Sequence, residues 1–385
     1  MPSISFLVHD IHCPVLGPVT ELARALEPCF PVQIVGPDFG HGVCPMYRDA
    51  FPYTVVSTPR LYRLPNFLWE RERLALAISG DLIISVKAYA DTLPVALKVK
   101  RQRGAKVVVY LDEWDGALYA RRNRWERLRA VLGGLHHPLE DWTHPWVERL
   151  IPRADEVVST TRSLQRRFGG RVIHMGVDLA QFSPPSDHEV ADLRKKWGLE
   201  ANRLVVFGGV VRPHKGIDDV VDALVRMGRP EVKLMVVGPV TEHLKRLQDD
   251  PQRARHLIAI GTRPKAEMPS FLAMADLVAL PLVDDLLAQS QMPCKVFEAM
   301  AMARPIVASE VSDLSEVLNG CGKVVAPGKV DGLVDAIAWI LDHPCEASSM
   351  GAAARSRCSE LYSREATQAA LFRLVEDLYE AGAAA

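Results

Sequence analysis

The chain lacks several features that would place it in a special class of protein. Its 385 residues contain no run of about 18 apolar residues, so we expect no membrane-spanning segment. The sequence begins with the strand-like Ile4–Val8 rather than with a basic and apolar leader, so we expect no export signal. Its formal net charge of −1 gives no reason to expect nucleic acid as a partner.

Cysteine pairs are missing as well. The seven cysteines are odd in number, widely spaced and never arranged as CxxC, so neither a disulfide framework nor a zinc site is indicated. We therefore expect a cytoplasmic protein. The composition, 48% hydrophobic and 24% charged, is typical of a globular enzyme, and the length fits two domains.

Short apolar runs rich in β-branched residues alternate with helical patterns in both halves of the chain. The expected strands are residues 4–8, 32–35, 81–86, 106–111, 156–159, 204–207, 233–237, 257–260, 277–280 and 305–308. Helical spacing lies between them, for example at residues 20–26 and 92–103. This alternation predicts α/β domains with doubly wound parallel sheets, which bind ligands at the carboxyl ends of their strands.

A polar, Pro-rich stretch at residues 184–187 separates the two strand series. We therefore place the first domain at residues 1–183 and the second at residues 184–360. Residues 361–378 have the 3–4 spacing of an amphipathic helix, so residues 361–385 are interpreted as a C-terminal helix with a loose tail.

Two basic residues follow an expected strand of the second domain. The run at 204–207 leads into Gly208 and Gly209, then into Arg212 and Lys215, and an apolar helix pattern begins at Ile217. A strand, a glycine turn and a helix start would bring both cations and free backbone N–H groups onto one anion, such as a diphosphate. A charged loop without a ligand is the alternative.

A second pattern lies in residues 290–308. Glu298 stands on an expected helix of otherwise small and apolar side chains, where a carboxylate is unfavourable unless it is paired or hydrogen-bonded. Two roles for Glu298 fit the sequence: binding a ligand, or forming a salt bridge with Lys295 or Arg304.

Together these segments resemble the C-terminal domain of glycosyltransferase family 4. Further matches are Met175–Asp178, Gly261 at the start of a loop, and Ala275–Leu277 with Pro281. The resemblance covers residues 155–345 and implies the GT-B fold, in which two Rossmann-like domains face each other across the active site and a C-terminal helix packs back across.

The resemblance also implies roles for single residues. Arg212 and Lys215 would neutralise the diphosphate of a UDP-sugar or GDP-sugar donor and act in catalysis, and Glu298 would bind the ribose hydroxyls. Gly209 and Arg263 belong to the same expected donor site. No cofactor or metal is expected, because the two cations stabilise the leaving group and no Asp-x-Asp motif lies between a strand and a loop.

The chain departs from the family pattern at three places. The family places a first Glu eight positions before the second, where this chain has Ser290, which resembles a subgroup with Pro-x-Lys-x-x-Glu, here Pro293, Lys295 and Glu298. Backbone groups near Met292 and Cys294 then become the candidates for binding the sugar. In the N-terminal domain Gly17 is present without the usual second glycine, and it is a candidate for close backbone approach to the donor or acceptor.

The third departure concerns the loop after residues 106–111. Many relatives carry a His-Asp pair there, whereas this chain has Asp112, Glu113 and Asp115, and Asp115 matches the family Asp. Acids at the carboxyl end of a strand are where an α/β sheet binds ligands. We expect Asp112 or Asp115 to bind the acceptor or to activate its hydroxyl.

Segment 120–146 does not fit the strand–helix alternation. It combines five arginines at residues 120–129 with Trp125, Trp142 and Trp146, and it is interpreted as a helical insertion. One interpretation is a solvated Arg face with tryptophans packed inward. The other is an acceptor-binding or peripheral membrane surface, since Arg with interfacial Trp suits anionic head groups.

The sequence thus predicts a glycosyltransferase that retains anomeric configuration and uses a nucleotide-sugar donor. The acceptor would be a sugar, a lipid-linked sugar or a small molecule. The alternatives are a sugar-nucleotide-binding subunit without robust transfer activity, and another GT-B enzyme such as a sugar-nucleotide epimerase.

Overall fold

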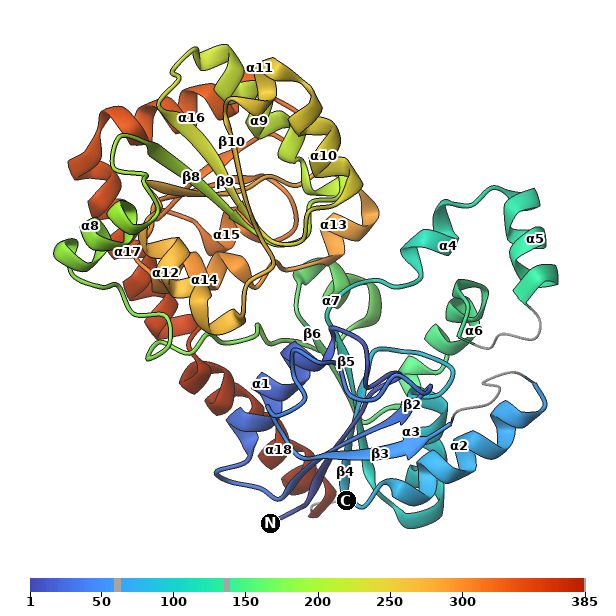
Figure 1. Ribbon diagram of the computed structural model, residues 1–385. Helices are drawn as coiled ribbons and strands as arrows, with labels where there is room; N and C mark the ends of the chain where they lie inside the picture. Colours follow the sequence, from blue (N-terminus) through green and yellow to red (C-terminus); the bar gives the residue numbers. More distant parts are fainter. Residues whose placement is uncertain (59–63, 135–138, 384–385) are drawn as a thin grey trace. The chain divides into compact units, whose positions relative to one another are not determined.

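The strands of the first half form one parallel sheet. The computed structural model describes residues 1–58, 64–134 and 139–383. The sheet has the order β3-β2-β1-β4-β5-β6-β7; β2 to β6 are labelled in Figure 1. The strands are β1 (Ile4–Leu7), β2 (Val32–Asp38), β3 (Tyr53–Ser57), β4 (Leu82–Val86), β5 (Lys106–Leu111), β6 (Glu156–Ser159) and β7 (Arg171–Val172).

Helices cover both faces of this sheet, so its central strands are apolar on both sides. On one face Leu16 of α1 (Leu16–Leu26) shares a buried cluster with Phe6 and Ile84. On the other, Leu74 of α2 (Asn66–Ala77) and Val95 of α3 (Leu93–Arg103) pack with buried strand residues. Helices α6 (His144–Glu148) and α7 (Arg162–Phe168) complete that layer.

The second half repeats this architecture. Its sheet has the order β10-β9-β8-β11-β12-β13, and all pairs are parallel. The strands are β8 (Arg203–Gly208), β9 (Val232–Val237), β10 (Leu257–Gly261), β11 (Leu277–Leu280), β12 (Ile306–Ser309) and β13 (Lys323–Val325). The predicted doubly wound α/β architecture is therefore confirmed in both halves.

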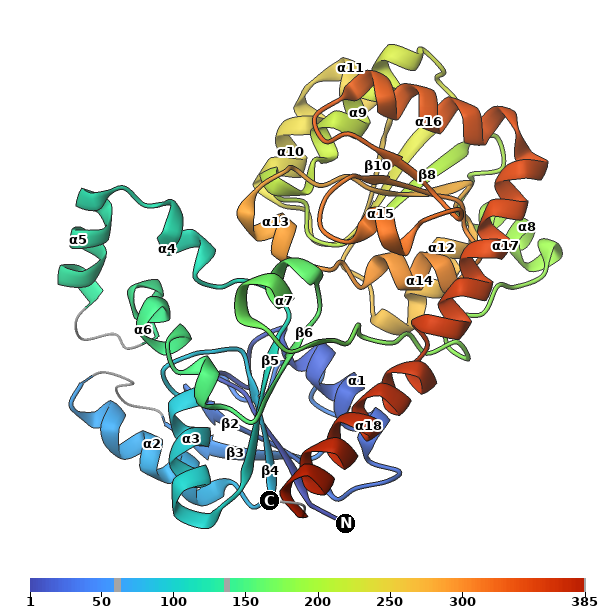
Figure 2. The same cartoon turned by 180° about the vertical axis from the view of Figure 1, so that it is seen from behind.

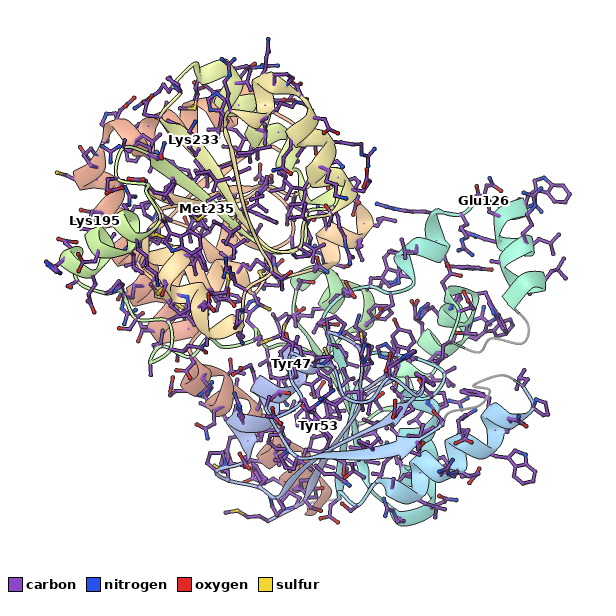
Figure 3. All side chains as sticks on the ribbon, viewed as in Figure 1. Tyr47, Tyr53, Glu126, Lys195, Lys233 and Met235 are labelled. Atoms are coloured by element: carbon purple, nitrogen blue, oxygen red, sulfur yellow. The ribbon has the colours of Figure 1, made fainter. Side chains whose placement is uncertain are left out.

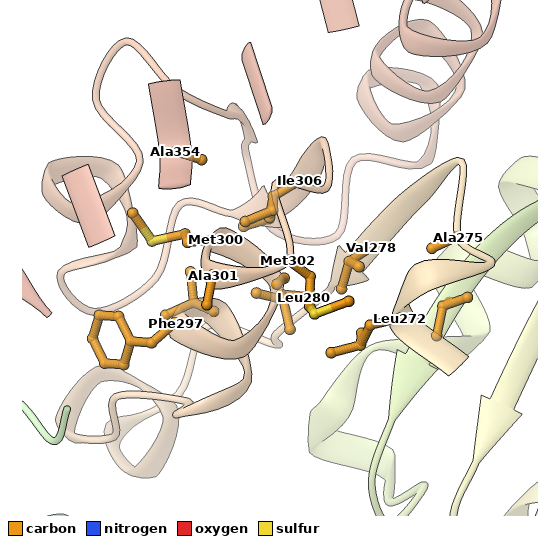
Figure 4. Close-up of a cluster of buried hydrophobic side chains, with 14 of the residues drawn as sticks. Leu272, Ala275, Val278, Leu280, Phe297, Met300, Ala301, Met302, Ile306 and Ala354 are labelled. Carbon is orange, nitrogen blue, oxygen red and sulfur yellow. The ribbon is translucent and has the colours of Figure 1, made fainter. Parts of the chain in front are cut away.

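Each face of the second sheet has its own core. One is formed with α9 (Ile217–Met227), α10 (Glu242–Asp249) and α16 (Val330–Asp342). The other is formed with α12 (Met268–Ala273), α14 (Lys295–Ala301) and α17 (Pro344–Leu361). The core formed with α12, α14 and α17 contains Phe297 and Met300 of α14 together with Ile306 and Ala354, all labelled in Figure 4.

The chain divides into two units, of which the first is residues 1–175 with 367–385 and the second is residues 176–366. The sequence-based boundary between residues 183 and 184 lies inside the second unit. The last helix, α18 (Arg364–Ala383), returns to the first unit (Figure 2). There Leu371, Leu374 and Val375 are buried in the same cluster as Ile4 and Phe6.

Segment 120–146 is helical, as predicted. It contains α4 (Ala117–Arg121), α5 (Arg124–Gly134), the 3-10 turn η1 (Asp141–Thr143) and α6, while its residues 135–138 lie outside the described residues. Among the helices of the described chain, none combines the length and the apolar character that crossing a membrane requires.

The chain segments at the two ends of the second unit are joined by backbone contacts. Val177 donates a hydrogen bond to the Tyr362 carbonyl (2.9 Å) and accepts one from the Arg364 N–H (3.0 Å). A Cβ placed on Gly176 would lie 2.3 Å from the carbonyl oxygen of Ser363. Only glycine fits this junction without a shift of the backbone.

Gly176→Ala is therefore expected to destabilise the second unit by about 1 to 3 kcal/mol, the usual range for overpacking at a site that cannot yield. Urea unfolding followed by circular dichroism measures the shift in midpoint. Gly133→Ala is the matched control, because a Cβ there meets nothing within 4 Å. Equal midpoints for the two variants would show that the junction tolerates a side chain.

Candidate functional site

The second sheet has a topological switch point between β8 and β11. From β8 the chain proceeds outward to β9 and β10, and it then returns to place β11 on the other side of β8. The loops that follow β8 and β11 consequently leave the same edge in opposite directions. In doubly wound sheets this is the position of the ligand crevice.

Glycines allow the backbone to come close together at this edge. Gly209 follows β8 with φ 139°, a conformation that side chains other than glycine rarely adopt. A Cβ on Gly238, at the end of β9, would lie only 2.1 Å from the Gly209 carbonyl oxygen. A Cβ on Gly209 would lie 2.8 Å from Cε of Lys295. The side chain of Lys295, from the start of α14, thus lies directly over the turn after β8.

Arg212 and Lys215 are placed by a short 3-10 turn, η3 (Pro213–Lys215), that follows the glycines. Arg212 is the residue before this turn and is exposed. Lys215 donates a hydrogen bond from Nζ to Oε1 of Gln291 (2.8 Å), which lies in the loop after β11. Gly216 then adopts φ 62° against Pro281 and starts α9. Lys215 and Lys295 therefore lie at the same switch point.

The loop after β11 contains α13 (Leu286–Ser290) and leads into α14. Ser290 is buried and donates its hydroxyl hydrogen to the Leu287 carbonyl (2.8 Å). Met292 is buried, and Cys294 precedes the first turn of α14. Residues 290–295 thus lead directly from this loop into the first turn of α14.

Glu298 lies in the first turn of α14 and is half-buried between the buried residues Phe297 and Ala299. The two salt-bridge partners considered from the sequence have other contacts. Lys295 lies over Gly209, and the Arg304 guanidinium donates to the carbonyls of Met302 and Ala275 (both 3.2 Å).

Two expected donor-binding residues have contacts elsewhere. The Arg263 guanidinium lies 5.4 Å from the ring centroid of Trp197, beside α8 (Asp187–Lys196). Gly17 lies in the first turn of α1, and a Cβ there would be 2.5 Å from the Tyr47 hydroxyl. Tyr47 in turn accepts a hydrogen bond from the Tyr53 hydroxyl at its carbonyl (2.9 Å; both residues are labelled in Figure 3). The small size of Gly17 is thus required by Tyr47.

The first sheet has its own switch point, between β1 and β4, and an ion-pair cluster lies beside it. Lys87 directly follows β4, and Asp112, Glu113 and Asp115 follow the neighbouring β5. The Lys87 ammonium donates to Glu113 and to Asp115 (2.9 Å) and lies 3.5 Å from Asp112. The two acids expected from the sequence are therefore brought together, and by a lysine that the sequence analysis missed.

Charges in this cluster are strongly coupled. Burial disfavours the Lys87 ammonium, but the attraction of Asp112, Asp115 and Glu113 outweighs it and raises the pKa of Lys87 well above its ordinary value. Burial raises the pKa of Asp112 to about 6; repulsion from Glu113 and Asp115 adds to the rise, against the attraction of Lys87. The pKa of Asp112 is thus well above the ordinary carboxyl value but still below neutral pH.

An aromatic group adjoins the acids. The Tyr89 hydroxyl donates to Asp115 (2.9 Å), while its ring stacks on His9 (centroids 4.2 Å apart) and meets His144 edge-on (4.9 Å). Burial, followed by repulsion from Lys87, lowers the pKa of His9 to about 3, so this imidazole is neutral at physiological pH. His9 therefore contributes no charge to the cluster.

A known protein family matches the second half of the chain. The family described as Glycosyl transferases group 1 matches residues 201–343. A GDP-mannose-dependent alpha-(1-6)-phosphatidylinositol monomannoside mannosyltransferase of Mycolicibacterium smegmatis is 31% identical over 277 residues, which are 63% of this chain and 72% of that relative. The D-rhamnosyltransferase WbpZ of Pseudomonas aeruginosa is 26% identical over 239 residues, 61% of each chain.

Solved structures resemble the whole chain. Anabaena Alr3699/HepE in complex with UDP superposes with a TM-score of 0.75 at 20% identity, covering 97% of this chain and 100% of that one. Sucrose-phosphate synthase from Thermosynechococcus elongatus superposes with a TM-score of 0.75 at 19% identity, and the match covers 99% of this chain and 100% of that one. These likenesses establish the fold as GT-B. With this fold and these relatives, the chain belongs to the group 1 glycosyltransferases, glycosyltransferase family 4, and is a nucleotide-sugar-dependent glycosyltransferase.

Proposed function

We propose that the switch point of the second unit binds the diphosphate of a GDP-sugar or UDP-sugar, and that the sugar is transferred to a hydroxyl acceptor with retention of configuration and without a metal ion. The observation that carries this proposal is the convergence of Lys215 and Lys295 on a glycine-lined sheet edge. An anion of two phosphates matches two ammonium groups, the nearby Arg212 and the backbone N–H groups of a glycine turn.

The cations act on the leaving group. As the bond from the anomeric carbon to the phosphate oxygen breaks, its electron pair stays on the nucleoside diphosphate. The acceptor oxygen forms the new bond on the same face, and its proton passes to the departing phosphate oxygen. Arg212 and Lys215 stabilise the growing negative charge, which lowers the barrier because this charge is larger in the transition state than in the bound donor.

Glu298 and the loop before it would bind the rest of the donor. We assign the ribose hydroxyls to the Glu298 carboxylate, because carboxylates accept hydrogen bonds from both hydroxyls of a diol. Since Ser290 stands where the first family Glu is expected, we assign the chain to the subgroup with Pro293, Lys295 and Glu298. The sugar hydroxyls would then contact the backbone at Met292 and Cys294.

The acid cluster of the first unit would bind the acceptor. Asp112 and Asp115 are carboxylates fixed at the carboxyl edge of β5, where hydroxyl groups of an acceptor can donate hydrogen bonds to them. With its pKa of about 6, Asp112 is mostly ionised at neutral pH and can accept a hydrogen bond that activates the acceptor hydroxyl, while the proton itself passes to the departing phosphate oxygen.

A lipid-linked acceptor is the class that we favour, because α5 exposes an apolar stripe among arginines. Trp125, Leu128 and Leu132 are spaced as one helical face, and Trp125 is 75% exposed. Figure 3 shows side chains projecting from this helix around Glu126. The surrounding arginines are Arg121, Arg122, Arg124, Arg127 and Arg129. Such a helix fits an anionic lipid surface.

The exposed Trp125 and Trp146 contradict the interpretation in which the tryptophans of this segment pack inward, whereas Trp142 is half-buried. On another helix of the first unit, α2, Trp69 is also exposed (74%). The mannosyltransferase of M. smegmatis carries a phosphatidylinositol mannoside in its name, which agrees with a lipid-linked acceptor for this chain.

The donor proposal is tested by incubating the purified chain with GDP-mannose, UDP-glucose and UDP-N-acetylglucosamine and a bacterial lipid extract. Mass spectrometry is expected to show a sugar added to a lipid and release of the nucleoside diphosphate from one donor. Failure of every sugar nucleotide to bind or react would overturn the proposal.

Arg212→Ala and Lys215→Ala are each expected to reduce kcat/KM by an amount equivalent to about 2 to 4 kcal/mol, the range for loss of a fixed electrostatic contact in a transition state. Steady-state kinetics with the donor found above provide the measurement. Lys245→Ala is the control, because Lys245 pairs with Glu242 (3.7 Å) on the exposed side of α10. Unchanged turnover would remove the substituted residue from the donor site.

Trp125→Ala combined with Leu128→Ala is expected to weaken binding to vesicles of phosphatidylcholine and phosphatidylglycerol about tenfold, through loss of apolar burial worth about 1.4 kcal/mol. Co-sedimentation with the vesicles at low and high salt measures this binding, and the affinity of the wild type for the vesicles should fall as the salt concentration rises. Leu361→Ala, which removes an exposed leucine of the second unit, is the control. If the wild type binds neutral phosphatidylcholine vesicles as tightly as it binds vesicles with phosphatidylglycerol, electrostatic attraction to anionic lipid is contradicted.

A further inference from the structure

Lys87 has a backbone conformation that residues with side chains seldom adopt. Its φ of 63° lies in the left-handed region, which costs an L-residue about 1 to 2 kcal/mol. The Lys87 N–H donates to the Tyr110 carbonyl (2.7 Å), and its carbonyl accepts from the Thr92 hydroxyl (3.0 Å), so the turn is held from both sides. Glycine would fit here at lower cost, and the presence of lysine indicates a use for its side chain.

The Lys87 side chain is enclosed by acids. Only 6% of it is exposed; its ammonium donates hydrogen bonds to Glu113 and Asp115 and lies 3.5 Å from Asp112, so three carboxylates surround one nitrogen. Burying an ammonium group is energetically unfavourable unless an anion pairs with it. Bringing three carboxylates close together is likewise unfavourable unless a positive charge lies between them, as the Lys87 ammonium does here. Lysine and acids therefore depend on each other.

Neighbouring contacts hold the acid loop in place. The Tyr89 hydroxyl donates to the same Asp115 oxygen that accepts from Lys87. Between Glu113 and Asp115, the Trp114 indole donates to Glu148 (2.8 Å), and the Arg167 guanidinium lies 3.7 Å from the Trp114 ring centroid. The carboxylates are thus oriented before any ligand arrives, as precise hydroxyl recognition requires.

We propose that Lys87 is a positioning residue for the transfer reaction, because it holds Asp112, Glu113 and Asp115 together as ionised carboxylates that receive the acceptor hydroxyl. This inference rests on the acceptor role proposed for the loop after β5. Lys87 acts through the carboxylates: without its positive charge they repel one another, at least one takes up a proton, and a protonated carboxyl is a poorer acceptor for the hydroxyl hydrogen.

The titratable groups around Lys87 come from five parts of the fold. The acids follow β5, Tyr89 follows β4, His9 follows β1, Cys13 precedes α1 and His144 begins α6. Burial raises the pKa of the Cys13 thiol. Burial and then Lys87 lower the pKa of His9 to about 3, so His9 is neutral near pH 7. Burial also lowers the pKa of His144, while the attraction of Asp115, Glu148 and Asp141 opposes this fall.

The direct test is a carboxylate titration of the full chain by 13C NMR. In the wild type, Asp112 is expected to titrate near pH 6. In Lys87→Met its midpoint should rise by about one to three pH units, the effect of losing one nearby opposite charge. Lys100→Met is the matched control, because it removes the partner of Asp155 (2.8 Å) outside this cluster, and the Asp112 midpoint should stay unchanged. An unmoved midpoint in Lys87→Met would overturn the proposal.

Kinetics distinguish positioning from a merely structural role. Lys87→Met should lower kcat about a hundredfold, with donor KM within about threefold of the wild type, and should move the acidic limb of the pH–rate profile to higher pH. Lys87→Arg keeps the charge and should leave this limb in place. If Lys87→Met does not fold, the Lys87→Arg variant provides the test. An acidic limb of its pH–rate profile that lies a full pH unit from the wild-type position would show that the positive charge at residue 87 does not set this limb.

The two proposals fail in different ways. If the wild type reacts with no sugar nucleotide, the donor proposal fails, yet the titration still shows whether Lys87 keeps the carboxylates ionised. If transfer occurs and Lys87→Met has the wild-type pH–rate profile, the donor proposal stands and the role of Lys87 is refuted.

Discussion

The approach of two backbones at Gly209 and Gly238 is the contact on which the donor side depends. The Gly209 carbonyl lies where a Cβ of residue 238 would be, and Lys295 lies where a Cβ of residue 209 would be. A side chain at residue 238 would force the turns after β8 and β9 apart, whereas a side chain at residue 209 would displace the end of Lys295. The missing Cβ atoms therefore leave room for Lys295 over the turn that leads to Arg212 and Lys215, at the point where the sheet reverses its strand order.

At the carboxyl edge of its sheet, the first unit carries a cluster of acids around one buried lysine. Its sheet places three carboxylates close together, and their repulsion is offset by one buried lysine held in an unfavourable backbone conformation. The two units thus carry complementary chemistry, since cations in the second suit a diphosphate and anions in the first suit hydroxyl hydrogens. Each edge is built by neighbouring parallel strands, so both sites follow from the doubly wound topology.

Much of the fold could be predicted from the sequence, because the central strands are buried on both faces and appear as continuous apolar runs. Each of the ten expected strands corresponds to a strand of the structure. The strands β3, β7 and β13 were missed because they are short or only partly buried at the sheet edges, where the apolar signal is weak.

The site was predictable only where a local pattern carries the chemistry. Arg212 and Lys215 lie within one glycine turn, so the sequence brings them together directly. Lys87 joins acids that lie about 25 residues further along the chain, and only strand order reveals that pairing. A lysine placed directly after a buried strand was the one available signal. Likewise, the contact of Gly17 with Tyr47 arises from a loop whose path no local pattern predicts.

The central claim is that the loops after β8 and β11 bind a nucleotide sugar. Hydrogen–deuterium exchange of the full chain with and without GDP-mannose or UDP-glucose tests it most directly. The account predicts that one of these donors slows exchange in residues 209–216 and 290–298, around the converging cations. Slower exchange elsewhere, with both loops unchanged at saturating donor, would contradict it.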